Sequence, residues 1–214
     1  MNQQARAAAT RTNLLMGAAR AFARRGYTAT TTNDILDEAG ATKGSLYFHF
    51  ASKEEIAVAV TRLQYEIWPA VVSEARSRAL TPLDALLDIL EETVDRFQHD
   101  IVVRASVRLN MERDLVSEEM PLPFVGWERL LCDLLDDAAR QGQLRAGVDP
   151  QVEARVLVAS YFGIQHRSLV LAGRRDLRQR CAEFWVRWIP AISADPALDA
   201  RVAARAREVL GTTA

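Results

Sequence analysis

Apolar side chains recur at three- and four-residue intervals along almost the whole chain, which is the spacing of amphipathic helices, and no segment alternates as a strand does. This pattern predicts an all-α fold of nine or ten helices. Long helices are expected at about residues 6–25, 53–79, 82–98, 101–113, 124–142, 150–172, 175–191 and 196–210, with two short helices between 31 and 50. Three of the long helices should begin at a proline, because Pro82, Pro150 and Pro196 each follow a residue that can cap a helix.

The stretch at residues 26–55 predicts the two short helices and a tight turn between them. Thr31 can cap the first helix through its hydroxyl, and Gly40 can end it in the left-handed conformation. Thr42 can cap the second helix, which is predicted over Lys43–His49 and carries several hydrogen-bond donors. Two helices joined by a glycine turn are the helix-turn-helix layout, in which the second helix lies in the major groove of DNA.

This stretch resembles the N-terminal domain of the TetR family of transcriptional regulators. The matching residues are Gly26, Tyr27, Thr30, Thr31, Ile35, Ala39, Gly40, Lys43, Gly44, Leu46, Tyr47, His49, Phe50, Lys53 and Glu54. The resemblance covers about the first quarter of the chain and implies a dimeric, all-helical repressor of double-stranded operator DNA. It implies an N-terminal three-helix helix-turn-helix domain at residues 1–52 and a helical ligand-binding and dimerisation body at residues 53–214.

The second short helix supplies the main candidates for contact with DNA. Lys43 can donate to guanine acceptors in the major groove, and Gly44 lets the backbone approach the DNA closely. Tyr47 and His49 suit contacts with phosphate, which set the register and the affinity of a complex. Each of these residues on its own would be an ordinary surface residue, and the surrounding motif favours the DNA-binding interpretation.

Other candidates lie at the starts of helices, where backbone N–H groups and the helix dipole favour phosphate. Thr42 can be a cap, a DNA contact or both, and Lys53 adds positive charge at the start of the next helix. The full set of candidates is Thr31, Thr32, Asn33, Thr42, Lys43, Gly44, Ser45, Tyr47, His49 and Lys53. The remaining apolar residues of this region are assigned mostly to a small core: Phe22, Ile35, Leu46, Phe48 and Phe50.

The charges are distributed unevenly along the chain. Residues up to Lys53 hold seven basic and three acidic side chains, a balance of +4, whereas the whole chain carries a formal charge of −1. The rest of the chain is therefore acidic, with a balance of −5. A basic N-terminal region on an acidic body suits a DNA-binding domain attached to a body that does not bind DNA.

The sequence favours a cytoplasmic protein that is not an enzyme. No apolar run is long enough for a transmembrane helix, and the N-terminal residues do not read as a signal peptide. Cys132 and Cys181 are expected to be free thiols. The three histidines lie in separate segments, and no spacing typical of a catalytic group, a metal site or a nucleotide-binding loop is present. We therefore expect no catalytic residues, no metal and no cofactor.

The body contains four candidates for contact with a small lipophilic ligand. The stretch at residues 120–131, MPLPFVGWERLL, resembles the γ-butyrolactone receptors of the TetR family, and the resemblance implies that Trp127 lines a ligand pocket. Gln64 can donate and accept hydrogen bonds from the helix that connects the two domains, while Tyr161 and Gln165 interrupt an apolar helix. The alternative interpretation is a core tryptophan, a solvated Gln64 and an ordinary helical core.

Aromatic residues near the C-terminal end are candidates for a homodimer interface. The residues concerned are Phe184, Trp185, Trp188 and Ile189, together with Leu157, Tyr161, Ile164 and Leu171. They suit a four-helix seam between two copies of the chain, although such a stripe is also typical of a plain core.

These features together predict a homodimeric repressor that binds a palindromic operator and is released by a lipophilic signal. A γ-butyrolactone-like hormone that controls secondary metabolism is the favoured signal, with butenolides, furan acids and unrelated lipophiles open as alternatives. Two other functions also stay open. The chain can be the repressor of a multidrug efflux gene, or an orphan regulator that responds to no ligand.

Overall fold

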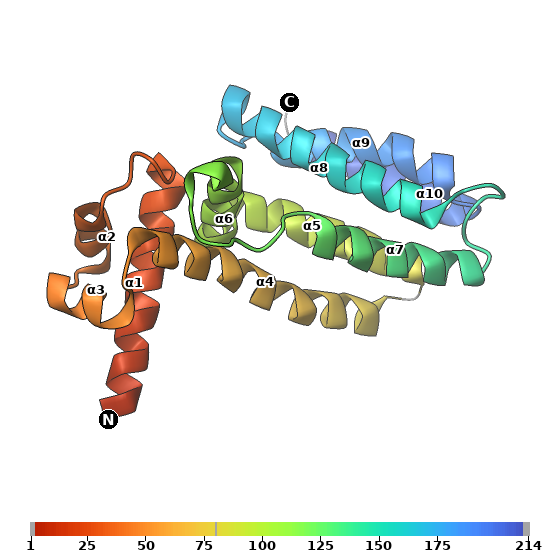
Figure 1. Cartoon of the computed structure of the whole chain (residues 1–214). Helices are drawn as coiled ribbons and strands as arrows, with labels where there is room; N and C mark the ends of the chain where they lie inside the picture. Colours follow the sequence, from red (N-terminus) through yellow and green to blue (C-terminus); the bar gives the residue numbers. More distant parts are fainter. Residues whose placement is uncertain (1–2, 80, 212–214) are drawn as a thin grey trace. The chain divides into compact units, whose positions relative to one another are not determined.

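The computed structural model describes residues 3–79 and 81–211, which are built almost entirely from helices (Figure 1). The ten α-helices of these ranges are α1 (Gln3–Arg25), α2 (Thr32–Ala39), α3 (Lys43–His49), α4 (Lys53–Arg78), α5 (Pro82–His99), α6 (Ile101–Met111), α7 (Val125–Arg140), α8 (Pro150–Ala172), α9 (Leu177–Ile192) and α10 (Pro196–Gly211). A short 3-10 helix, η1 (Arg113–Leu115), follows α6. The described residues contain no strand, so the all-α prediction is confirmed.

The predicted caps and prolines account for the starts of five helices and the end of one. Thr31 accepts a hydrogen bond from the Asp34 backbone N–H, and Thr42 accepts one from the Ser45 N–H. Gly40 ends α2 in the left-handed region, with φ at 58°, which a side chain would disfavour. Helices α5, α8 and α10 begin at their prolines, as predicted, because proline at the first position costs no intrahelical hydrogen bond.

The described helices form two units by their contacts. The first unit comprises residues up to Pro69 together with His99–Leu122, and the second comprises Ala70–Gln98 and the residues from Pro123 onward. These units differ from the predicted division at residue 52, because α6 and the segment that follows it pack with α1 and the start of α4. The assignment of DNA binding to residues 1–52 stays a prediction.

Helix α1 is central to the core of the first unit. Its buried residues Leu14, Leu15, Ala18 and Phe22 belong to one cluster with Ile35 of α2, Leu46 of α3 and Leu109 of α6. Helices α2, α3 and α6 all contact α1. Gly17 lies at the closest approach to α2, since a Cβ placed on it would come within 2.8 Å of the Ala39 backbone nitrogen.

The segment at residues 112–122 is bonded to the rest of the first unit. The Glu112 carboxylate accepts hydrogen bonds from the backbone N–H and the hydroxyl of Thr28, each at 3.0 Å. Val116 and Met120 are buried in the core that α1 organises. The Tyr65 hydroxyl donates to the Leu122 carbonyl at 3.2 Å. The segment therefore belongs to the same packed body as the two short helices.

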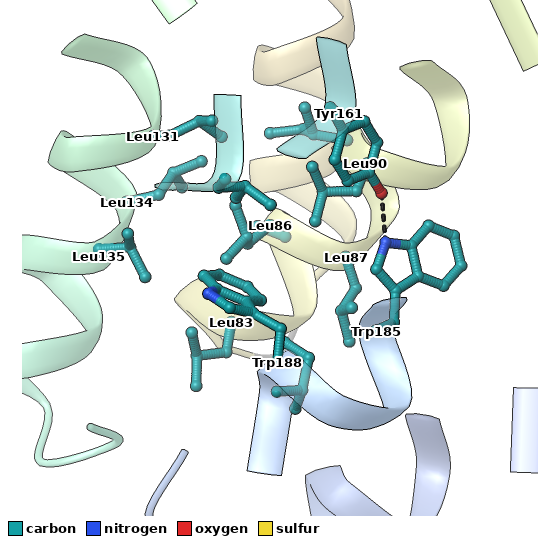
Figure 2. Close-up of a cluster of buried hydrophobic side chains, with 14 of the residues drawn as sticks. Leu83, Leu86, Leu87, Leu90, Leu131, Leu134, Leu135, Tyr161, Trp185 and Trp188 are labelled. Carbon is teal, nitrogen blue, oxygen red and sulfur yellow. Dashed lines mark hydrogen bonds between the residues drawn. The ribbon is translucent and has the colours of Figure 1, made fainter. Parts of the chain in front are cut away.

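The core of the second unit consists mainly of leucines and aromatic residues. Leu83, Leu86, Leu87 and Leu90 of α5 lie with Leu131, Leu134 and Leu135 of α7, and with Trp185 and Trp188 of α9 (Figure 2). Helix α8 packs against α7 and α9, and α10 packs against α9.

The predicted dimer stripe is largely part of this core. Trp185, Trp188 and Ile189 of α9 are buried, as are Leu157 and Tyr161 of α8. Their use as an outward-facing interface is therefore wrong, because the neighbouring helices of the same chain cover them. Among the helices of the described ranges, none is long and apolar enough to span a membrane.

Replacement of Gly17 by alanine tests the close packing of α1 on α2. The new methyl group would meet the backbone of Ala39, which cannot move aside as a flexible side chain can. We expect Gly17→Ala to lower the free energy of unfolding by about 1–3 kcal/mol, as overpacked cores do. Thermal and urea unfolding followed by circular dichroism measure the change.

Gly44→Ala is the matched control, since a Cβ at Gly44 meets nothing within 4 Å. Alanine has the higher helix propensity, so this variant should be as stable as the original chain or more stable. A Gly17→Ala protein as stable as Gly44→Ala would contradict the packing argument.

Candidate functional site

Helix α3 is held by its inward side chains and presents the others to solvent. Leu46 and Phe50 are fully buried in the core of the first unit. Lys43, Gly44 and Tyr47 are exposed. The Lys43 ammonium lies 5.9 Å from the centre of the Tyr47 ring, a distance at which the two attract each other weakly. The exposed face of α3 therefore carries a cation, a glycine and an aromatic hydroxyl, as the sequence predicts.

Phe48 is exposed, and its assignment to the small core is wrong. Its side chain is 78% exposed. The reason lies in the helical period: Leu46 and Phe50 are four residues apart and share the inward face, so the residue midway between them points outward. The spacing of these three residues is the signal that identifies Phe48 as a surface residue, and sequence reasoning missed it.

The start of α2 already carries a negative charge. The Asp34 carboxylate accepts hydrogen bonds from the Thr31 backbone N–H at 2.8 Å and from its hydroxyl at 2.7 Å, and it pairs with Arg25. These hydrogen bonds, led by the one from the backbone, hold the pKa of the Asp34 carboxyl below its ordinary value. Thr31 thus has a structural role as the cap of α2. Thr32 is half-buried and Asn33 is exposed, and their contact with phosphate stays a prediction.

Lys53 connects the start of α4 to the loop before α2. Its ammonium donates to the carbonyl oxygens of Tyr27 and Thr30, each at 3.0 Å, and lies 4.1 Å from the centre of the Tyr27 ring. Burial, followed by the nearby Glu54 carboxylate, raises the pKa of Tyr27 to about 12, so this hydroxyl stays protonated. Two of the three ammonium donors of Lys53 are therefore used within the chain, which leaves one for a phosphate.

The remaining DNA candidates lie around these positions. Thr42 and Ser45 bond to each other, since Thr42 accepts from the Ser45 N–H at 3.2 Å and its carbonyl accepts from the Ser45 hydroxyl at 2.8 Å. The His49 ring is half-buried and contacts the Phe48 ring edge-on at 4.9 Å. The first unit therefore gathers all ten predicted DNA-contact residues, although several also hold the fold together.

Three of the four predicted ligand contacts belong to the second unit. Tyr161 is buried, and its hydroxyl accepts a hydrogen bond from the Trp185 indole N–H (Figure 2). Burial raises the pKa of Tyr161 well above its ordinary value. Gln165 lies one turn further along α8 and accepts from Arg174 at 3.2 Å. Trp127 of α7 is half-buried and packs against the same core.

Two buried amide groups have polar atoms without a hydrogen-bond partner in the described part of the chain. The Gln165 side chain is 1% exposed, and its amide nitrogen is unsatisfied. Gln64 belongs to the first unit, is 7% exposed, and has an unsatisfied side-chain oxygen. A solvated Gln64, the alternative interpretation, is wrong. The other three candidates belong to the second unit.

The chain matches two descriptions of known protein families. Residues 14–60 match the bacterial regulatory proteins of the tetR family, and residues 80–193 match the tetracyclin repressor-like C-terminal domain. The chain belongs to the TetR family of transcriptional regulators. This regulator is similar to the A-factor receptor protein of Streptomyces griseus, with 35% identity over 90% of this chain and 67% of that protein.

Solved structures of related proteins resemble this chain closely. One, described as the molecular basis for control of antibiotic production by bacterial hormones, shares 43% identity with a TM-score of 0.83 and covers 86% of this chain and 98% of its own. Another is the TetR family protein CprB from Streptomyces coelicolor in complex with its biological operator sequence, at 31% identity and a TM-score of 0.83 over 95% and 98% of the two chains. These relatives are transcriptional regulators, which agrees with the expectation that the chain is not an enzyme.

Paired substitutions of Lys43 and Lys53 separate DNA contact from structure. Lys53→Met removes two charged hydrogen bonds and a cation–π contact, so we expect the free energy of unfolding to fall by about 1–3 kcal/mol. Lys43→Met should change it by no more than about 0.5 kcal/mol, as exposed substitutions do, and weaken operator binding about tenfold or more. Urea unfolding and fluorescence anisotropy on labelled operator DNA measure the two effects. Unchanged operator affinity in Lys43→Met would remove Lys43 from the DNA interface.

Proposed function

We propose that this TetR family regulator is a homodimeric repressor that binds a palindromic operator and leaves it when a small lipophilic signal binds. The observation that carries the proposal is the face of α3, where Lys43, Gly44 and Tyr47 stand exposed on a helix fixed from below by Leu46 and Phe50. Two copies would place two such helices in successive major-groove segments, so the symmetry of the dimer would match that of the DNA. We expect the protein in the cytoplasm, where its operator lies.

A second apolar face on α8 supports dimerisation. Six of its exposed residues follow one another at intervals of four, three, four, three and four: Val152, Val156, Ala159, Gly163, His166 and Val170. This average of 3.6 residues is the period of an α-helix, so the six residues lie along one face of α8. The opposite face of α8 is buried in the second unit. Ala159 and Gly163, in the middle of the stripe, would let a second helix approach closely.

A second copy of the chain is the occupant that this stripe fits. Val156 is 43% exposed and Val170 is 66% exposed, which is costly for a stripe of this length in water. The arginines at positions 155 and 167 flank the stripe and are exposed, as polar residues beside a helical seam are. The stripe pairs with itself across a two-fold axis, so both copies bury the same surface.

The ligand proposal rests on the core of the second unit. Trp127, Tyr161 and Gln165 border a core of leucines and tryptophans, which suits a lipophilic molecule. The unsatisfied amide nitrogen of Gln165 would donate to a carbonyl or hydroxyl oxygen of the ligand, since an unpaired buried donor costs about 1–3 kcal/mol. The relatives that respond to A-factor and to bacterial hormones make a γ-butyrolactone-like signal that controls antibiotic production the favoured class.

Release requires that the ligand bind one conformation of the protein better than another. The ligand-favoured conformation would set the two recognition helices at a spacing that no longer matches the half-sites. By linkage, operator DNA would weaken ligand binding by the same factor.

Introduction of a charge into the stripe on α8 tests the dimer. Ala159→Glu should leave the fold intact, because residue 159 is exposed, and should shift the protein in sedimentation experiments toward the 23.8 kDa chain. Operator affinity should fall by about a hundredfold, since two unlinked chains lose the effective concentration that links the half-sites.

Gln151→Glu adds the same charge on an exposed residue of α8 outside the stripe and should stay dimeric. An Ala159→Glu protein that sediments as the original chain does would place the dimer interface on another surface.

The whole proposal is tested by a gel shift of the purified protein on DNA from its own upstream region, with and without a solvent extract of the producing culture. We expect the protein to retard the DNA and the extract to abolish the shift. Trp127→Ala should still bind the DNA but need at least about tenfold more extract, because a flat wall of the site is lost. Arg129→Ala, at an exposed position of the same helix, is the matched control.

A shift that no extract releases would overturn the ligand proposal and leave the DNA-binding proposal intact. Release of Trp127→Ala at the same extract concentration would remove Trp127 from the ligand site.

A further inference from the structure

Phe48 is the most exposed of the large apolar side chains among the residues that the structure describes. It is 78% exposed and stands on α3, the helix that the proposed function places in the major groove. A single exposed aromatic residue is common on protein surfaces and needs no partner. On a helix that enters a groove, however, the same ring must meet the DNA or be covered by it.

The neighbours of Phe48 leave one side of its ring open. The His49 ring stands edge-on to it, at 4.9 Å between ring centres and 84° between planes. Gly44 lies one turn earlier on the same face, and helical side chains lean toward the N-terminal end of their helix. A Cβ at Gly44 would meet nothing within 4 Å beyond its two chain neighbours, so the helix surface one turn before Phe48 is open.

The major groove offers an apolar group at only one base. Guanine, adenine and cytosine present hydrogen-bond donors and acceptors there, whereas thymine adds its C5-methyl group. A phenyl ring makes no hydrogen bond with the polar base edges. Only contact with the thymine methyl group therefore offsets the free-energy cost of desolvating those edges. Phosphate contacts would not repay it either, since the ring carries no charge.

We infer that Phe48 reads a thymine in each half-site by covering its C5-methyl group. The inference rests on the proposed DNA-binding function. Lys43 and Phe48 are five residues apart on α3, which corresponds to about 7.5 Å along a helix axis, or about two base-pair steps. The thymine therefore lies within about two base pairs of the base that Lys43 contacts.

The experiment begins with operators selected by the original chain from a random DNA pool. Each thymine of a selected half-site is then replaced in turn by uracil, which differs only in lacking the methyl group. Affinity is measured by fluorescence anisotropy for the original chain and for Phe48→Ala. The comparison forms a double-mutant cycle between one side chain and one methyl group.

We expect one thymine per half-site at which uracil weakens binding by the original chain about three- to fivefold, the factor for burial of roughly one methyl group. Phe48→Ala should bind the thymine operator at least that much more weakly and should not distinguish uracil from thymine at that position. Phe48→Leu should keep part of the discrimination. The salt dependence of binding should be unchanged in Phe48→Ala, because no phosphate contact is lost.

Leu115→Ala controls for the loss of an exposed apolar side chain in the same unit, since Leu115 is 58% exposed and lies outside α3. It should bind both operators as the original chain does. All variants should unfold at the same temperature.

Two results would overturn the inference while DNA binding stands. One is an original chain that tolerates uracil at every thymine. The other is a Phe48→Ala protein that loses as much affinity on the uracil substitution as the original chain does. A chain that selects no DNA sequence from the pool would instead refute the proposed function, and the inference with it.

Discussion

The packing of α1 determines the arrangement of the first unit, because helices α2, α3 and α6 all contact it. Its buried face combines leucines with small residues, and Gly17 brings its backbone against the backbone of α2. Protein interiors are packed as densely as organic crystals, so a contact this close has few alternative arrangements. The position of α3 relative to α6 is therefore fixed, although the two helices are far apart in the sequence.

This arrangement bears on how the ligand that we propose for the second unit would act on α3. The chain passes between the units at three places: Pro69–Ala70, Gln98–His99 and Leu122–Pro123. Pro69 lies inside α4, where it cannot donate the usual helical hydrogen bond. The third passage leads into Phe124, whose φ of 74° and the bond from the Val125 N–H to the Pro123 carbonyl form a strained γ-turn. Helix α6 and residues 112–122 are part of the first unit, which also contains α3. A shift at Gln98–His99 or at Leu122–Pro123 would therefore move α3 as well.

Local sequence signals predict where the helices begin and end, but they do not predict which helices pack against one another. Thr31, Thr42 and the three helix-starting prolines determine boundaries through groups within a few residues, so the sequence predicts them well. The docking of α6 on α1 depends on contacts between distant segments, and no local pattern encodes it. The same holds for Lys53, whose charge suggests phosphate but whose nearest partners are carbonyl oxygens of a loop more than twenty residues away.

The apolar residues whose burial was predicted wrongly show what helical periodicity does not determine. Trp185 and Phe48 are both aromatic residues on amphipathic helices, yet one is buried by its own chain and the other is 78% exposed. Helix α8 is apolar on two faces, a pattern that indicates a fully buried helix, yet its own chain covers only one of them. An apolar residue on a helix is expected to pack against other apolar groups. The sequence does not say whether those groups belong to the same chain. We propose that a second copy of the chain covers the exposed face of α8, and that the methyl group of a thymine covers Phe48.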